Sequence, residues 1–126
     1  MNSLEEVTEF ATLTDVIYKT WAGKTAKEYK KFKELKKENL RDNMPNKELV
    51  INMLAELSTK EISEVSNPKT FPEHEDVDRC GSNIAKEARM KLETETGKKV
   101  VSPLNAKSIL SLGNKKDKKK DNGNGG

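Results

Sequence analysis

The chain lacks most of the residues that build disulfides, metal sites and nucleophilic centres. Its 126 residues include one cysteine, Cys80, and one histidine, His74. A single cysteine forms no internal disulfide, which indicates a reducing, cytoplasmic setting. A zinc site would need carboxylates for all its other ligands, and on a helix the six-residue spacing puts His74 and Cys80 about 240° apart. We therefore expect no metal site, no cofactor and no catalytic residue of the Cys/His kind.

Aromatic residues and long apolar runs are also scarce. Hydrophobic residues make up 33% of the chain and aromatic residues 5%, which disfavours a β-sandwich core. Even the segment 49–57 is interrupted by Asn52 and Glu56, so no run approaches the ~20 apolar residues of a transmembrane helix. The sequence contains no phosphate-binding loop, dinucleotide fingerprint or nucleophile elbow. We expect a protein that is not an enzyme and does not enter a membrane.

What the sequence does contain is apolar residues at helical spacing. The clearest stripe predicts a helix over 46–66, and a second stripe predicts a helix that Gly97 ends. Capping boxes predict further helix starts near Ser3, Thr12 and Thr25. No segment alternates apolar and polar residues over the length of a strand. The predicted fold is therefore an all-α bundle of about five to six helices.

The end of the chain is predicted to differ from the rest. Ser102, followed by proline, predicts the start of a last helix. Beyond Gly113 the sequence holds only Asn, Lys, Asp and Gly, which cannot bury enough apolar surface to fold. We expect a helical domain over 1–113 and a disordered basic tail over 114–126. Within the second stripe, Gly81 costs about 1 kcal/mol relative to alanine, which close contact with another helix or with a partner's backbone would explain.

The net charge of +3 is unevenly distributed along the chain. The segments 1–18, 19–41, 42–80 and 81–113 carry −4, +6, −5 and +3, so the body is neutral and the tail holds the excess. The basic segment 24–41 has eight cations in eighteen residues, with aromatic residues between them. These cations are candidates for nucleic-acid binding: Lys24, Lys27, Lys30, Lys31, Lys33, Lys36, Lys37 and Arg41. A solvated helix face or a contact with a partner protein fits the same pattern.

The stripe over 46–66 is a second candidate surface. In a small domain with a modest core, shorter helices can leave such a stripe partly open, to be covered by a second copy. The candidate interface residues are Leu49, Val50, Met53, Leu54 and Leu57. A homodimer through this helix and a complete monomeric bundle are both consistent with the pattern.

Four stretches of the chain carry a family resemblance. They read GKTAKEYK (23–30), LKKENLRDNM (35–44), SNIAKEAR (82–89) and SPLNAK (102–107). Together they resemble the C-terminal region of the DNA-damage-inducible protein D family and of phage antirepressors with a BRO-type N-terminal domain. That N-terminal domain has no counterpart here, and Glu34 stands where the family pattern commonly has glycine.

The resemblance implies a bacterial or phage accessory protein of the DNA-damage response or of mobile-element regulation. It implies no enzymatic activity and marks no catalytic residue. Together with the neutral body, it favours a regulatory module that binds a protein partner, such as a recombination or repressor protein. The alternative is direct binding of nucleic acid by the basic segment 24–41, assisted by the Lys-rich tail.

Overall fold

The computed structural model describes residues 3–110, and within them the chain is all-helical without a strand. This confirms the predicted small all-α bundle; the predicted tail lies outside the described residues. A further helical run occupies residues 106–110. The elements with both ends described are the helices α1 (Ser3–Ala22), α2 (Ala26–Phe32), α3 (Asn46–Ser66) and α4 (Phe71–Thr96), and the 3₁₀ helix η1 (Arg41–Asn43).

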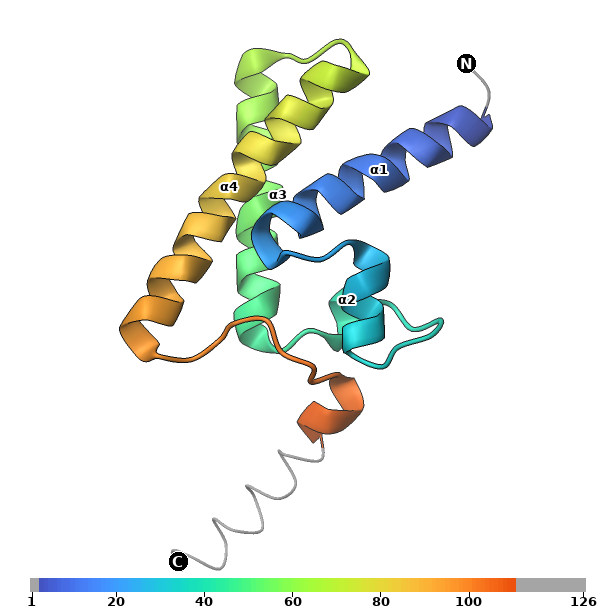
Figure 1. Ribbon diagram of the computed structural model, residues 1–126. Helices are drawn as coiled ribbons and strands as arrows, with labels where there is room; N and C mark the ends of the chain where they lie inside the picture. The colour runs from blue at the N-terminus through green and yellow to red at the C-terminus, as the bar shows by residue number, and fades with distance from the viewer. Residues whose placement is uncertain (1–2, 111–126) are drawn as a thin grey trace, which may run out of the picture.

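Helices α3 and α4 form a long hairpin, and α1 packs across it (Figure 1). Asn67 ends α3 in the left-handed conformation, with φ of 51°, and the Thr70 hydroxyl caps α4 by accepting a hydrogen bond from Glu73 N at 3.3 Å. The short helix α2 and the segment after α4 lie at the opposite end from this turn (Figure 1). The hairpin therefore provides the frame on which the basic segment is mounted.

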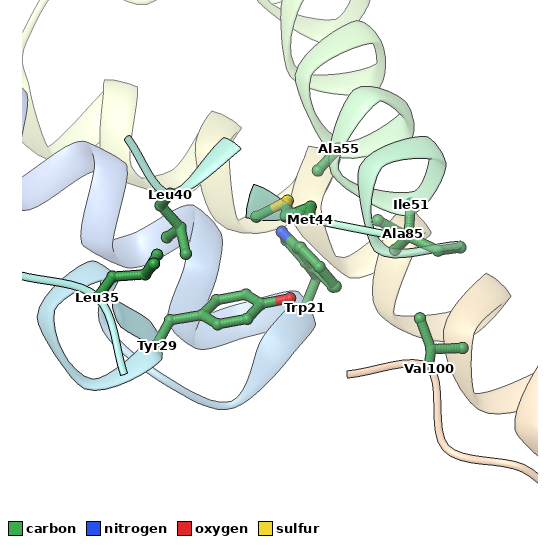
Figure 2. Packing of buried hydrophobic residues seen from close by; sticks show 9 residues of the cluster. All are labelled: Trp21, Tyr29, Leu35, Leu40, Met44, Ile51, Ala55, Ala85 and Val100. Carbon is green, nitrogen blue, oxygen red and sulfur yellow. The ribbon is translucent and has the colours of Figure 1, made fainter. Parts of the chain in front are cut away.

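The core lies at the end of the hairpin near α2, where the four helices, the segment between α2 and α3 and the segment after α4 converge (Figure 2). Trp21 and Tyr29 are fully buried, and their rings meet edge to face with centroids 6.0 Å apart. Trp21 Nε1 donates to Asn52 Oδ1 at 3.3 Å, and Arg89 Nε donates to Trp21 O at 2.6 Å. The remaining buried members are Leu35, Leu40, Met44, Ile51, Ala55, Ala85 and Val100.

Small residues line the contact between α3 and α4. Ala55, Ser82 and Ala85 have no exposed surface. A Cβ built on Gly81 would lie 2.5 Å from Thr59 N and 2.6 Å from Thr59 Cα. Of the two explanations for Gly81, the structure supports close contact with a neighbouring helix, since the backbone of α3 occupies the space that a side chain would need.

Most helix ends follow their predicted caps, but two predicted starts are wrong. Thr25 and Gly97 cap as expected. No helix begins near Thr12, because α1 continues through it. The last helix does not begin after Ser102 either: residues 103–105 are not helical, and Asn105 Oδ1 accepts from Ser108 N at 2.9 Å instead. The Ser102 hydroxyl is engaged elsewhere, in the buried network described below.

Candidate nucleic-acid interface

The basic segment folds into a short helix and a loop that turns back on it. The Thr25 hydroxyl accepts from Glu28 N at 3.2 Å, and the Glu28 carboxylate accepts from Thr25 N at 2.8 Å, which completes the capping box. After α2, Glu34 takes a φ of 60°, a left-handed conformation that glycine adopts more readily. Leu35 N then donates to Lys30 O at 2.8 Å, as in a Schellman motif. This turn determines where the following lysines project.

An open hollow of about 680 Å³ lies beside this turn, and lysines line it. Lys27, Lys30 and Lys31 contribute from α2, and Lys36 contributes from the loop. The other lining residues are Ala26, Glu34 and Leu35. Four ammonium groups against one carboxylate give this concave surface a positive potential, which attracts phosphate groups. We call these four side chains the lysine hollow.

Three other predicted cations are not among the residues that line the hollow. Lys37 is exposed. Lys24 Nζ lies 4.3 Å from the centroid of the Phe32 ring, a cation–π contact. Arg41 Nη1 lies 2.6 Å from both carboxylate oxygens of Glu56, so its charge is largely compensated by α3. The eight cations therefore do not form one continuous stripe.

The prediction that Lys33 binds nucleic acid is wrong, because its side chain has no exposed surface. Its Nζ lies 2.8 Å from Glu48 Oε1 and donates to Ser102 O at 2.8 Å and Leu104 O at 2.6 Å, so each of its three protons has an acceptor. Burial lowers the pKa of Lys33, and the Glu48 carboxylate opposes that effect. No phosphate reaches this ammonium group, which instead ties α2 to α3 and to the segment after α4.

Glu48 is the centre of this buried network. Tyr29 donates its hydroxyl proton to Glu48 Oε1, and Ser102 Oγ donates to Glu48 Oε2 at 2.8 Å. Burial and the bond to Glu48 raise the pKa of Tyr29 above its ordinary value. Asn105 Nδ2 donates to Lys33 O at 2.9 Å, which is a second attachment of the segment after α4. The basic pattern groups Lys33 with the candidate nucleic-acid-binding residues, although its i+4 spacing from Tyr29 places both on one helix face.

The aromatic residues of the basic segment do not form a platform for base stacking. Tyr29 is fully buried in the core. Phe32 is 38% exposed, but Lys24 lies over its ring and Phe32 does not line the hollow. Stacking by Tyr29 is therefore ruled out, and contact with phosphate groups is the interaction that this surface offers.

The predicted interface on α3 is divided between core and surface. Val50, Met53 and Leu57 are 61%, 48% and 56% exposed and recur at the i, i+3, i+7 spacing of one helix face. Leu49 and Leu54 are half-buried and pack against the core, so they are unsuitable as contact residues for a partner. We call Val50, Met53 and Leu57 the α3 stripe.

Within residues 3–110, no three His, Cys, Asp or Glu side chains gather in a way that could hold a metal ion. His74 and Cys80 both lie exposed on α4. Over the same residues, no helix has the length and apolar character needed to span a bilayer.

Comparison of the chain with family models, curated proteins and solved structures found no match. The resemblance to the DNA-damage-inducible protein D and BRO-type antirepressor proteins therefore stays a prediction.

Proposed function

We propose that the protein is a non-enzymatic nucleic-acid-binding protein that contacts the phosphate backbone through the lysine hollow. The observation that carries the proposal is the gathering of Lys27, Lys30, Lys31 and Lys36 around one concave surface. Each phosphate neutralised by a lysine releases condensed counterions, so binding of this kind weakens as salt rises. Contacts to phosphate alone carry no sequence information, so we expect little sequence preference.

The proposal is tested by fluorescence anisotropy of a labelled single-stranded DNA in a salt series, with the full chain. Lys27, Lys30 and Lys31 are replaced together by glutamine, which removes charge but keeps side-chain length. We expect at least tenfold weaker binding, and a fall of about 2 in the slope of log K against log salt, since each lost phosphate contact contributes about 0.7.

A matched control replaces three lysines away from the hollow, Lys60, Lys69 and Lys98, by glutamine. These residues are exposed and lie outside α2 and its loop. The control has the same net charge as the hollow variant and keeps the same tail. Equal loss of affinity in both variants, or none in the hollow variant, would contradict the proposal.

A second function is favoured by the α3 stripe, namely binding of a protein partner. Val50, Met53 and Leu57 expose large apolar side chains on one face of a 21-residue helix, which is typical of a surface that another protein covers. The resemblance to a region outside the BRO-type domain supports the same function. The measurement is affinity purification with quantitative mass spectrometry, comparing the natural chain with a Met53→Glu, Leu57→Glu variant. A partner recovered equally by both chains would show that the α3 stripe is not the surface that binds it.

A further inference from the structure

A second hollow, of about 270 Å³, lies where α1 meets α3 and α4. Its wall from α1 is mainly apolar, and the other two helices contribute polar side chains. The lining residues are Leu13, Thr14, Ile17 and Tyr18 of α1, Asn52 and Glu56 of α3, and Asp78 of α4. The volume admits a small organic molecule but not a folded partner.

Asp78 is the group in this hollow whose charge is not compensated. It is 8% exposed, and none of the hydrogen bonds or ion pairs of the described residues involves its carboxylate, whose oxygens still reach the open space of the hollow. The neighbouring Ser82 hydroxyl donates to the main-chain oxygen of Asp78, not to its carboxylate. His74, one turn away on α4, is exposed and interacts with Asp78 electrostatically without forming an ion pair. A buried carboxylate normally has a partner, because leaving it unpaired is costly.

The two polar residues that α3 contributes to the hollow already have partners. Glu56 is held by Arg41 at 2.6 Å and accepts from Asn52 Nδ2 at 3.3 Å. Asn52 Oδ1 accepts from Trp21 Nε1 at 3.3 Å. Burial is the main cause that raises the pKa of Tyr18, so its phenol is neutral at physiological pH. The hollow therefore presents one unpaired anion, Asp78, beside an aromatic ring and aliphatic side chains.

We propose that this hollow binds a small organic cation, a primary ammonium on a compact apolar body. The ammonium would donate a charge-assisted hydrogen bond to Asp78, which supplies the counter-charge that the fold does not. The face of the Tyr18 ring attracts the same positive charge, and Leu13 and Ile17 cover the apolar body. An inorganic divalent ion fits less well, because the described residues do not gather the three or more ligands it requires.

The test uses two probes of the same shape, benzylamine and benzyl alcohol, of which only the first is charged at neutral pH. Each is titrated into the full chain at millimolar concentrations while the amide NMR resonances of Ile17 and Asp78 are followed. We expect saturable shifts with benzylamine and at least tenfold weaker binding of benzyl alcohol. Absence of shifts, or equal affinity for the two probes, would overturn the proposal without any substitution.

A pair of isosteric substitutions then locates the charge that matters. Asp78→Asn keeps the shape of the side chain and removes the anion. We expect it to weaken the binding of benzylamine at least tenfold and to leave the affinity for benzyl alcohol unchanged. Asp76→Asn removes an exposed carboxylate from the same helix turn and is the control. Retention of benzylamine affinity in folded Asp78→Asn, or equal loss in both variants, would show that Asp78 is not the counter-ion.

Discussion

Lys33 and Glu48 form an ion pair in the interior of the protein, although charged side chains usually lie at the surface. Both side chains are completely buried, whereas the other ion pairs of the described residues have exposed fractions between 14% and 80%. Two buried charges lose their hydration, and only complete pairing offsets that cost. Tyr29, Ser102 and the carbonyl of Leu104 complete the pairing here. The network therefore specifies where the segment after α4 docks, in addition to any stability it provides.

We expect Lys33→Met to lower the free energy of unfolding by about 3–5 kcal/mol, because it leaves the Glu48 carboxylate buried without its cation. Chemical denaturation followed by circular dichroism measures the change. Lys37→Met, at an exposed position of the same segment, should change stability by less than about 0.5 kcal/mol. Adding Glu48→Gln to Lys33→Met should recover part of the loss, since the unpaired charge is gone. Additive losses in the double variant would contradict the coupling.

Asp78 makes stability depend on pH in the opposite sense to a salt-bridged carboxylate. Burial raises its pKa from 3.8 to about 6, and the electrostatic interaction with His74 opposes this shift. The folded state thus binds the proton more tightly than the unfolded state, and stability falls as pH rises from about 4 to about 6. Asp78→Asn should remove this dependence and raise the free energy of unfolding by about 1–3 kcal/mol at pH 7.5. Chemical denaturation of both chains at pH 5 and pH 7.5 measures these free energies. If the natural chain and Asp78→Asn show the same change in stability between the two pH values, Asp78 is not the cause of the pH dependence.

At the scale of elements, the sequence predicts what local interactions decide. The span of α3, the capping box at Thr25 and the stop at Gly97 depend on residues within one or two turns, and each was predicted. Ser102 does not cap a helix, since the chain after it is not helical: its hydroxyl donates to Glu48, 54 positions away, at 2.8 Å and accepts from Leu104 N at 3.4 Å. The lysine hollow was predicted only as a basic segment, since its concave shape depends on the left-handed turn at Glu34.

The contact between α3 and α4 depends on the missing side chain at Gly81. In an isolated helix, Gly81→Ala would gain about 1 kcal/mol. Here the new methyl group would lie within 2.6 Å of the Thr59 backbone, so the helices must separate. We expect a net loss of about 1–3 kcal/mol in thermal or chemical unfolding. Asn83→Ala, exposed on the same helix, is the control and should be neutral or slightly stabilising. Equal effects at the two positions would mean that the contact is not tight in solution.

At the scale of the whole molecule, the core and the candidate surfaces occupy different parts of the fold. The buried residues concentrate where α2 and the segment after α4 meet the hairpin (Figures 1 and 2). The lysine hollow lies on the α2 side of this core, whereas the α3 stripe faces away from it. Substitutions in either surface therefore leave the core residues in place, and the two binding functions are separable by mutation.

The α3 stripe is also the face through which a homodimer would form, one of the two arrangements with which the pattern over 46–66 is consistent. Leu54→Glu is unsuitable as a probe, because Leu54 packs against the core and a charge there would destabilise the monomer. Leu57→Glu places the same charge at a side chain that is 56% exposed. If a homodimer forms through this face, Leu57→Glu should halve the mass measured by light scattering and leave the helix content unchanged. Met90→Glu, at a position of α4 that is 49% exposed, should remain dimeric. A natural chain that is monomeric at high micromolar concentration would leave the stripe free for a different partner and exclude the homodimer.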